Sequence, residues 1–224
     1  TGGAWMIVGD TAMPEILKQG AIKSLDRKVC NTLNTCCIVA SRAVELVPVL
    51  LDGLNEAAAK LEQEYRLHVV EGSEDFIPEE AFARKVAINR ADGQHEEFQA
   101  SILPAADIGR EWEWENSPEI TLIVVKDLQE AIQLFNAHSP RLVASLISND
   151  EQEHQHFYKT VDAPFISDGH TRWVDGQRAL NKPELGLSNW ANGRLFGRHA
   201  ILTGDSVYTV RVRYVEASNG LSPT

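Results

Sequence analysis

The segment TLIVVKDLQEAIQLFNAHSPRLVASLIS, residues 121–148, decides the fold class of this chain. Its first part, Thr121–Val125, is an apolar, β-branched run that predicts a buried strand. Asp127 follows, with Glu130 three residues later, which is a capping-box pattern for the start of a helix. Val143–Ser148 is a second apolar strand. A strand, a helix and a strand in this order are typical of a parallel sheet covered by helices.

The same alternation extends outward from this segment in both directions. The predicted strands are Ala4–Val8, Cys36–Ala40, Leu67–Val70 and Ala163–Ser167, and the predicted helices are Pro14–Ser24, about Arg42–Tyr65, Pro78–Arg84 and Asn149–Lys159. Pro48 falls within the first two turns of the long helix, so a start at Pro48 is the alternative to a start at Arg42. Ala91–Glu97 is predicted to be a loop. We expect an α/β fold with an open, twisted, mostly parallel sheet and helices on both faces.

The C-terminal part of the chain has a different pattern. In Val207–Val215, apolar or aromatic residues alternate with Thr and Arg, which predicts a strand with one solvated face. This strand is either a β-arm that joins the sheet of another subunit or an edge strand of its own domain. We therefore expect a cysteine-bearing domain over residues 1–206, the strand over 207–216, and a disordered tail over 217–224.

Composition narrows the classes of function. With 224 residues, 43% of them hydrophobic, the chain can bury a sizeable core, and its net charge of −11 disfavours binding to nucleic acid. No apolar run approaches the roughly 20 residues that span a bilayer, and no signal peptide opens the chain. We expect a cytoplasmic protein that acts on a small molecule and contacts neither membrane nor nucleic acid. Because Thr1 lies within an element, we also expect the sequence to be a domain of a longer polypeptide.

Three cysteines are candidates for chemistry. Cys30, Cys36 and Cys37 cannot all pair, and no second cysteine pair completes a zinc site, so cytosolic thiols are predicted. Cys30 follows Arg27 and Lys28, whose positive charges favour the thiolate that a nucleophile needs. The alternative for each cysteine is a small buried apolar residue, which suits the apolar run around Cys36 and Cys37.

Several short motifs occur in a fixed order along the chain. They are Thr1-Gly2-Gly3, Cys30-Asn31-Thr32 with the apolar segment after it, Thr171-Arg172-Trp173-Val174-Asp175-Gly176, Glu184-Leu185-Gly186-Leu187-Ser188 and Gly193-Arg194. In order and spacing they resemble the γ-glutamyl phosphate reductases (glutamate-5-semialdehyde dehydrogenases), a branch of the aldehyde dehydrogenase superfamily. Departures from the family pattern are Asn34 in place of Glu, His170 in place of Ser, and Lys182-Pro183 in place of Gly-Leu-Gly. They indicate a divergent branch, with a different acyl donor as an alternative.

The resemblance implies an aldehyde dehydrogenase-like catalytic domain and an NADPH-dependent reduction of γ-glutamyl phosphate to the semialdehyde, in proline biosynthesis. In that reaction Cys30 forms a thioester, and its backbone N–H and the Asn31 side chain stabilise the oxyanion. Arg172 grips the carboxylate or phosphate of the substrate. Ser188 donates a hydrogen bond to the substrate, and Glu115 contacts a cofactor ribose. The full-length protein is expected to be a homo-oligomer.

Each of these roles has an alternative. Arg172 can form a structural ion pair, with Asp175 or Glu184 as partner, and Asn31 and Ser188 can hold turns. His170 can form a Cys–His dyad with Cys30, which would indicate a cysteine hydrolase or acyltransferase. A non-catalytic binding or oligomerisation module of the same fold is a further alternative. Because no glycine-rich phosphate-binding turn occurs, we expect NADP(H) to be bound mainly by a domain outside this sequence.

Overall fold

The structure is a computed structural model that describes residues 3–172, 190–191, 194–195 and 211–215. Its main sheet has eight strands in the order β12-β9-β8-β1-β2-β7-β3-β6, and every neighbouring pair is parallel. The strands are β1 (Ala4–Val8), β2 (Leu33–Val39), β3 (Arg66–Val70), β6 (Ala100–Leu103), β7 (Glu119–Val125), β8 (Val143–Ile147), β9 (Phe165–Ser167) and β12 (Val212–Tyr214). The predicted α/β fold with a mostly parallel sheet is confirmed.

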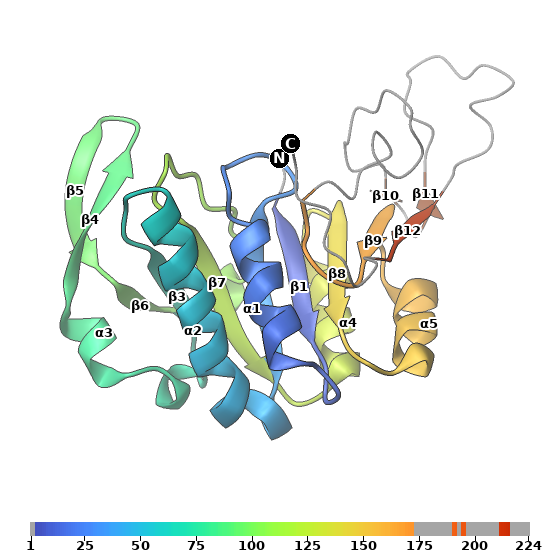
Figure 1. Cartoon of the computed structure of the whole chain (residues 1–224). Coiled ribbons are helices and arrows are strands. Elements are labelled where there is room, and N and C mark those ends of the chain that lie inside the picture. Colours follow the sequence, from blue (N-terminus) through green and yellow to red (C-terminus); the bar gives the residue numbers. More distant parts are fainter. Residues whose placement is uncertain (1–2, 173–189, 192–193, 196–210, 216–224) are drawn as a thin grey trace, which may run out of the picture.

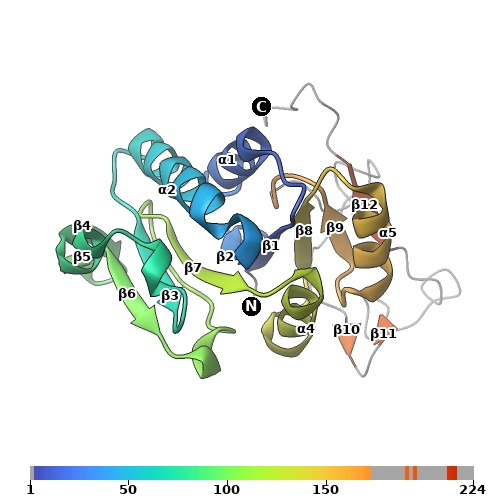
Figure 2. The same cartoon turned by 90° about the horizontal axis from the view of Figure 1, so that it is seen from below.

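Helices cover both faces of this twisted sheet (Figures 1 and 2). On one face, α1 (Pro14–Lys23) and α2 (Ala43–Lys60) pack against each other, and α4 (Leu128–His138) and α5 (Glu151–Thr160) lie on the other. The shorter helices are α3 (Glu79–Ala83), η1 (Ala40–Arg42), η2 (Glu74–Phe76) and η3 (Ala105–Asp107). The predicted capping box is confirmed, since Asp127 accepts a hydrogen bond from the Glu130 backbone N–H at 2.9 Å.

Two antiparallel pairs lie outside the main sheet. β4 (Lys85–Arg90) and β5 (Gly93–Phe98) form a hairpin beyond β6, and β10 (Trp190–Ala191) pairs with β11 (Arg194–Leu195). The prediction of a loop over Ala91–Glu97 is therefore wrong. β5 is solvent-exposed on both faces, so it carries no apolar alternation that would mark it as a strand. The signal that was overlooked is Asp92-Gly93, because Gly93 has φ = 129° just after the turn.

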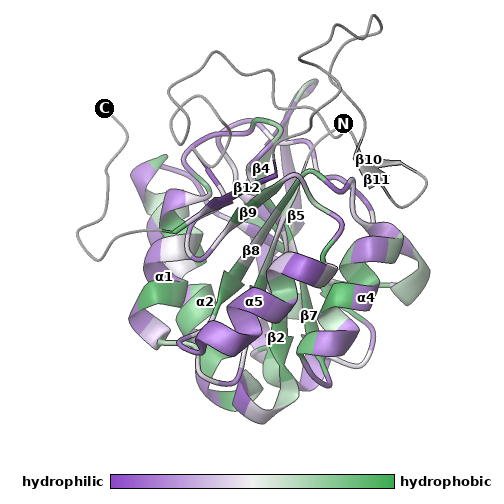
Figure 3. Ribbon diagram, turned by 90° about the vertical axis from the view of Figure 1, so that its right-hand side faces the viewer, coloured by the Kyte–Doolittle hydropathy of each residue, from purple (hydrophilic) through white to green (hydrophobic). Residues whose placement is uncertain are grey.

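The core lies between the helices and the central strands. All residues of β1, β2 and β8 are buried, and Figure 3 shows apolar strands between helices whose outer faces are polar. Continuous burial on both faces explains why these strands have continuous apolar runs instead of alternating ones. Among the residues that the structure describes, no helix is long and apolar enough to cross a membrane.

Two further expectations concern the boundaries of elements. α2 begins at Ala43, one residue after the predicted start at Arg42, so the alternative start at Pro48 is wrong: the proline lies inside the helix. Val212–Tyr214 pairs with β9 at the edge of the main sheet, so these three residues form an edge strand of their own domain. The rest of the predicted C-terminal strand before Arg211, and the tail from residue 217, lie outside the described residues.

Candidate active site

Cys30 lies in the loop between α1 and β2, at the amino ends of the parallel strands. The backbone N–H of Gly3 donates to the Cys30 carbonyl oxygen at 2.7 Å, and that of Ala4 donates to Thr32 at 2.9 Å. These bonds join the Cys30 loop to the start of β1. Gly3 has φ = 103°, a conformation that glycine adopts without strain.

Exposure separates Cys30 from the other two cysteines. All three are present as thiols, but Cys30 is exposed whereas Cys36 and Cys37 are buried within β2. Burial raises the pKa of the Cys36 thiol, and burial together with the charges of Cys36 and Glu130 raises that of Cys37. The expectation that Cys36 and Cys37 are buried apolar residues is confirmed. Cys30 is the cysteine that an electrophile in solution can reach.

The loop around Cys30 has internal hydrogen bonds. The hydroxyl of Thr32 donates to the Arg27 carbonyl at 2.6 Å and accepts from the Val29 N–H at 2.8 Å. The Thr32 N–H donates to the Val29 carbonyl at 3.0 Å. Thr32, completely buried, thus stabilises a compact turn with Cys30 near its apex.

Arg172 and Thr171 hold this loop from outside. Arg172 is 3% exposed; its Nε donates to Asp26 at 2.7 Å and its Nη1 to the side-chain oxygen of Asn31 at 2.5 Å. Thr171 donates through its hydroxyl to the Asn31 carbonyl and through its N–H to the Ser24 hydroxyl, both at 2.8 Å. The structure therefore gives Arg172 an ion-pair partner, Asp26, that the sequence did not suggest.

The position of Asn31 follows from the same contacts. Its side chain is buried beside Cys30, and its amide oxygen accepts from Arg172. This contact fixes which end of the Asn31 amide faces Arg172. The geometry thus brings together three residues that the resemblance had singled out: Cys30, Asn31 and Arg172.

A second segment lies directly beside the Cys30 loop. Asn34 at the start of β2 donates to the Arg110 carbonyl at 2.9 Å and accepts from the Trp112 N–H at 2.9 Å. Lys28 forms an ion pair with Glu111 at 3.2 Å. Asn34, which replaces the Glu of the resembled family, therefore holds the backbone of residues 110–112 against β2.

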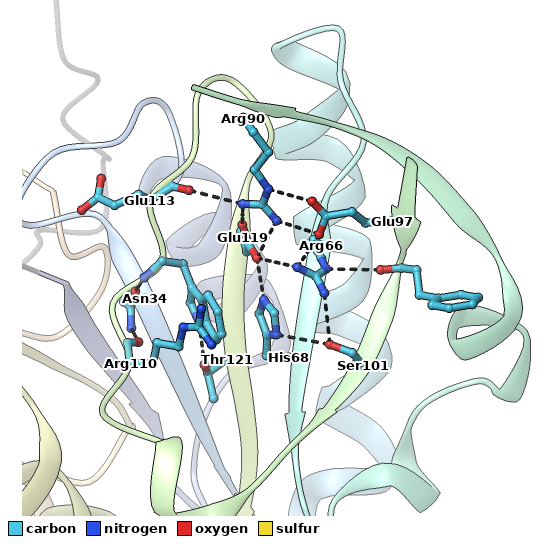
Figure 4. Close-up of polar contacts among 12 residues, drawn as sticks. Asn34, Arg66, His68, Arg90, Glu97, Ser101, Arg110, Glu113, Glu119 and Thr121 are labelled. Atoms are coloured by element: carbon cyan, nitrogen blue, oxygen red, sulfur yellow. Dashed lines mark hydrogen bonds and ion pairs between the residues drawn. The ribbon is translucent and has the colours of Figure 1, made fainter. Parts of the chain in front are cut away.

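Behind this segment is a buried polar cluster that sequence reasoning missed (Figure 4). The Trp112 ring stacks on the His68 ring, with centroids 3.4 Å apart. His68 Nε2 lies 2.6 Å from a Glu119 carboxylate oxygen, and Arg90 and Arg66 bind the same carboxylate at 2.5 and 3.2 Å. Arg66 and His68 are close together on β3, but Arg90, Trp112 and Glu119 come from β4, the 110–115 segment and β7, so no single local motif could have identified the cluster.

The electrostatics of this cluster favour an ionised Glu119. Burial by itself would raise the pKa of Glu119, but hydrogen bonds from His68 and Arg90 outweigh it and lower the pKa to about 2. Burial lowers the pKa of His68, more than the contact with Glu119 raises it. Glu97 completes the charge balance, because it forms ion pairs with both Arg66 and Arg90. The cluster ties the β4–β5 hairpin to the amino ends of β3 and β7.

Glu115, predicted to contact a cofactor, is exposed and lines a pocket of about 700 Å³. The pocket lies between the hairpin and the 113–115 segment, and its other lining residues are Arg90, Ala91, Asp92, His95, Glu97, Glu113 and Trp114. Carboxylates predominate, so the pocket offers hydrogen-bond acceptors for hydroxyl groups and disfavours phosphate. Trp112 and Trp114 are both buried, as expected for core residues.

His170, the other candidate partner of Cys30, lies within the described part of the chain. His170 is buried, and its ring packs edge-on against Tyr214 with centroids 5.9 Å apart. Ser188, Asp175 and Glu184 lie outside the described residues. Within the described part of the chain, no group of three or more His, Cys, Asp or Glu side chains could hold a metal ion.

The opposite end of the sheet is closed by its own side chains. In open α/β sheets, ligands usually bind at the carboxyl ends of strands whose connections run to opposite faces, as β1 and β8 do here. In this chain the Thr11 and Ser148 hydroxyls lie 2.8 Å apart and Ser148 donates to Glu153 at 2.5 Å. A Cβ on Gly9 would lie only 2.9 Å from the Glu153 carboxylate, so that side chain fills the crevice.

Comparison with known proteins identifies the fold. No protein-family model matches the chain, and no curated protein is significantly similar in sequence. Among solved structures, the γ-glutamyl phosphate reductase of Thermotoga maritima matches with a TM-score of 0.62 and 17% identity, over 80% of this chain and 37% of that one. An NADP-dependent glyceraldehyde-3-phosphate dehydrogenase from Bacillus halodurans, complexed with NADP, matches with a TM-score of 0.50 and 20% identity, over 76% and 38%.

A 1-pyrroline-5-carboxylate dehydrogenase from Thermus with bound NAD matches with a TM-score of 0.50 and 17% identity, over 78% of this chain and 36% of that one. The chain therefore shares the aldehyde dehydrogenase-like α/β fold of part of these structures. It spans little more than a third of the length of these structures.

Proposed function

We propose that this chain is the cysteine-bearing part of an NADPH-dependent acyl-phosphate reductase, with γ-glutamyl phosphate as substrate and Cys30 as nucleophile. One observation carries the proposal: Cys30 is exposed in a loop held by Asn31, Thr171 and Arg172, whereas Cys36 and Cys37 are buried. This arrangement occurs within a fold that the reductase of Thermotoga maritima shares. It suits a reaction in which one thiol must be accessible and fixed in position.

In the first step, the Cys30 thiolate attacks the carbonyl carbon of the acyl phosphate. A carbon–sulfur bond forms, the bond from that carbon to the phosphate oxygen breaks, and inorganic phosphate leaves with the electron pair. Sulfur suits this step because an ionised thiol is a strong nucleophile. The Cys30 backbone N–H and the Asn31 amide nitrogen are the donors proposed to stabilise the oxyanion that forms during the attack.

Bound NADPH would supply the hydride that reduces the thioester carbonyl to the aldehyde. The proposed contact from this chain is Glu115, whose exposed carboxylate can accept hydrogen bonds from ribose hydroxyls. The acidic lining of the pocket suits such hydroxyls and not the cofactor phosphates. We therefore propose that the phosphates are bound by another part of the enzyme. Cys30 holds the acyl group during reduction and then leaves as the thiolate.

Acylation of Cys30 tests the proposal directly in this chain. The chain is incubated with γ-glutamyl phosphate or acetyl phosphate, and adducts are located by peptide mass spectrometry. We expect one hydroxylamine-labile acyl group on Cys30, and none in Cys30→Ala. Cys37→Ala is the matched control and should be acylated like the wild type, since Cys37 is buried.

Other outcomes would indicate other functions. Acylation that persists unchanged in Cys30→Ala would contradict the proposal. Rapid release of the free acid from Cys30, abolished in His170→Ala, would indicate a cysteine hydrolase instead. If Cys30 reacts with no acyl phosphate in the folded chain, a non-catalytic module of the same fold is favoured.

A further inference from the structure

We infer that Arg172 is a positioning residue that holds the Cys30 loop in its reactive conformation, and that it does not bind the substrate. This inference rests on the proposed function, because it assigns a role within the same site. Arg172 contacts the loop on both sides of the nucleophile, at Asp26 before it and at Asn31 after it.

The hydrogen bonds of Arg172 leave it little capacity for a substrate anion. Nε and Nη2 donate to the two carboxylate oxygens of Asp26 at 2.7 and 3.4 Å, and Nη1 donates to Asn31 at 2.5 Å. All three nitrogens of the guanidinium therefore have acceptors within the chain. Arg172 is 3% exposed, whereas the side chain of Asp26 is 36% exposed, so a carboxylate or phosphate would have to displace Asp26 or Asn31 from a buried guanidinium.

Thr171 strengthens the same contact. Its hydroxyl binds the Asn31 carbonyl, and its N–H binds the hydroxyl of Ser24, which in turn donates to Gly20 at the end of α1. Two adjacent residues that follow β9 thus hold the end of α1 and both flanks of the Cys30 loop. The Cys30 carbonyl is held separately by Gly3. The backbone on either side of the thiol is therefore fixed by segments distant in sequence.

Positioning matters for attack on a carbonyl more than for simple alkylation. Attack on an acyl phosphate requires the sulfur and the oxyanion donors to be aligned together, and a displacement of about 1 Å can slow such a reaction roughly 100-fold. Alkylation by iodoacetamide requires only an exposed thiolate. The two reactions at one sulfur therefore separate loss of position from loss of exposure or ionisation.

Arg172→Lys and Asp26→Asn are the test variants, both made in the full chain. A lysine ammonium is a single point charge that cannot bind Asp26 and Asn31 in the same fork, and the Asp26→Asn change removes the ion pair. We expect each variant to slow acylation of Cys30 by acetyl phosphate at least about tenfold. Iodoacetamide alkylation should change less than about threefold, and hydrogen exchange at the Val29 and Thr32 amides should become faster.

Arg42→Lys is the matched control, because Arg42 also binds a carboxylate and backbone carbonyls but lies at the carboxyl end of the sheet. It should leave acylation of Cys30 unchanged. Alkylation of Cys36 and Cys37 reports unfolding in any variant, and a test variant that unfolds is replaced by Arg172→Gln. Wild-type acylation rates and exchange rates in either Arg172→Lys or Asp26→Asn would overturn the inference.

A substrate-binding role predicts a different result. Arg172→Lys would then raise the acetyl phosphate concentration needed for half-maximal rate, without faster hydrogen exchange in the loop, and Asp26→Asn would have no such effect. Absence of acylation in the wild type would contradict the proposed function. Hydrogen exchange would still decide whether Arg172 holds the loop. Failure of the proposed function and failure of the inference about Arg172 are therefore distinguishable.

Discussion

At the scale of single residues, the amino end of the sheet contains one half-exposed ion pair and one buried carboxylate. Arg172 and Asp26 hold a loop whose cysteine is exposed, whereas Glu119 lies with its side chain completely buried among Arg66 and Arg90. A buried ion pair is not by itself a source of stability, but removing one partner is costly because the other remains without compensation. Glu119 is the residue at which this cost should be largest.

We predict that Glu119→Gln destabilises the chain by about 3 kcal/mol at pH 7, because Arg66 and Arg90 lose a buried carboxylate. Urea unfolding followed by tryptophan fluorescence measures this change. Glu45→Gln is the control: Glu45 pairs with Arg42 on the surface, and its removal should have little effect. Equal changes in the two variants would contradict the assigned role of Glu119.

The same residue predicts a pH dependence. The pKa of Glu119 is lowered from 4.5 to about 2 in the folded chain, so the unfolded chain binds the proton more readily. The stability from Glu119 is therefore fully present above about pH 4.5 and is lost as pH falls towards 2; it amounts to about 3 kcal/mol. The difference between the wild type and Glu119→Gln should shrink over that range, as measured by urea unfolding at several pH values.

At the scale of elements, α2 contains a local defect. Pro48 is exposed and lies in the sixth position from Ala43, where an N–H would otherwise donate to the Val44 carbonyl. The helix forms nevertheless, because its apolar face is buried against α1 and the sheet. Tertiary packing thus outweighs the local preference of proline, which had left a later start of the helix open.

We predict that Pro48→Ala stabilises the chain by about 1–2 kcal/mol, since it restores a hydrogen bond and the gain exceeds the added entropy of the unfolded chain. Thermal unfolding should show a Tm higher by a few degrees. Pro14→Ala is the matched control, because Pro14 is at the first position of α1, where no N–H is needed. A lower Tm for Pro48→Ala would indicate that the proline shapes α2 for packing.

At the scale of the whole molecule, one end of the sheet is closed and the other carries the candidate site. Ser148 and Glu153 fill the crevice at the carboxyl ends, while Cys30, Glu115 and the Glu119 cluster lie at the amino ends. The chain spans 37% of the reductase that shares its fold. The amino end is therefore the side on which we propose that the cofactor, and the part of the enzyme that binds its phosphates, approach.

This arrangement predicts that the chain alone binds NADPH weakly. Its pocket beside Glu115 is acidic, so a phosphate-bearing cofactor should bind with a Kd no tighter than about 1 mM. Isothermal calorimetry measures the affinity, and acylation of Cys30 in the same preparation shows that the site is folded. A Kd in the low micromolar range would contradict the prediction.

The sequence by itself determined the βα alternation, because apolar runs and caps such as Asp127 are local signals that burial reinforces. It also indicated Cys30, through a motif of adjacent residues. It did not predict β5, whose exposed residues carry no apolar alternation, and for Arg172 it left both a substrate contact and a structural ion pair open.

Only the tertiary structure decided that Arg172 binds Asp26 and Asn31, and that Glu119, His68 and Trp112 meet. The partners in these contacts are mostly separated by dozens of residues or more, and no local pattern records which of many charged side chains will meet once the strands pair. Burial then makes such pairing obligatory, since an unpaired charge inside the molecule is costly. Local periodicity therefore determined the elements, and the register of the assembled sheet determined the site.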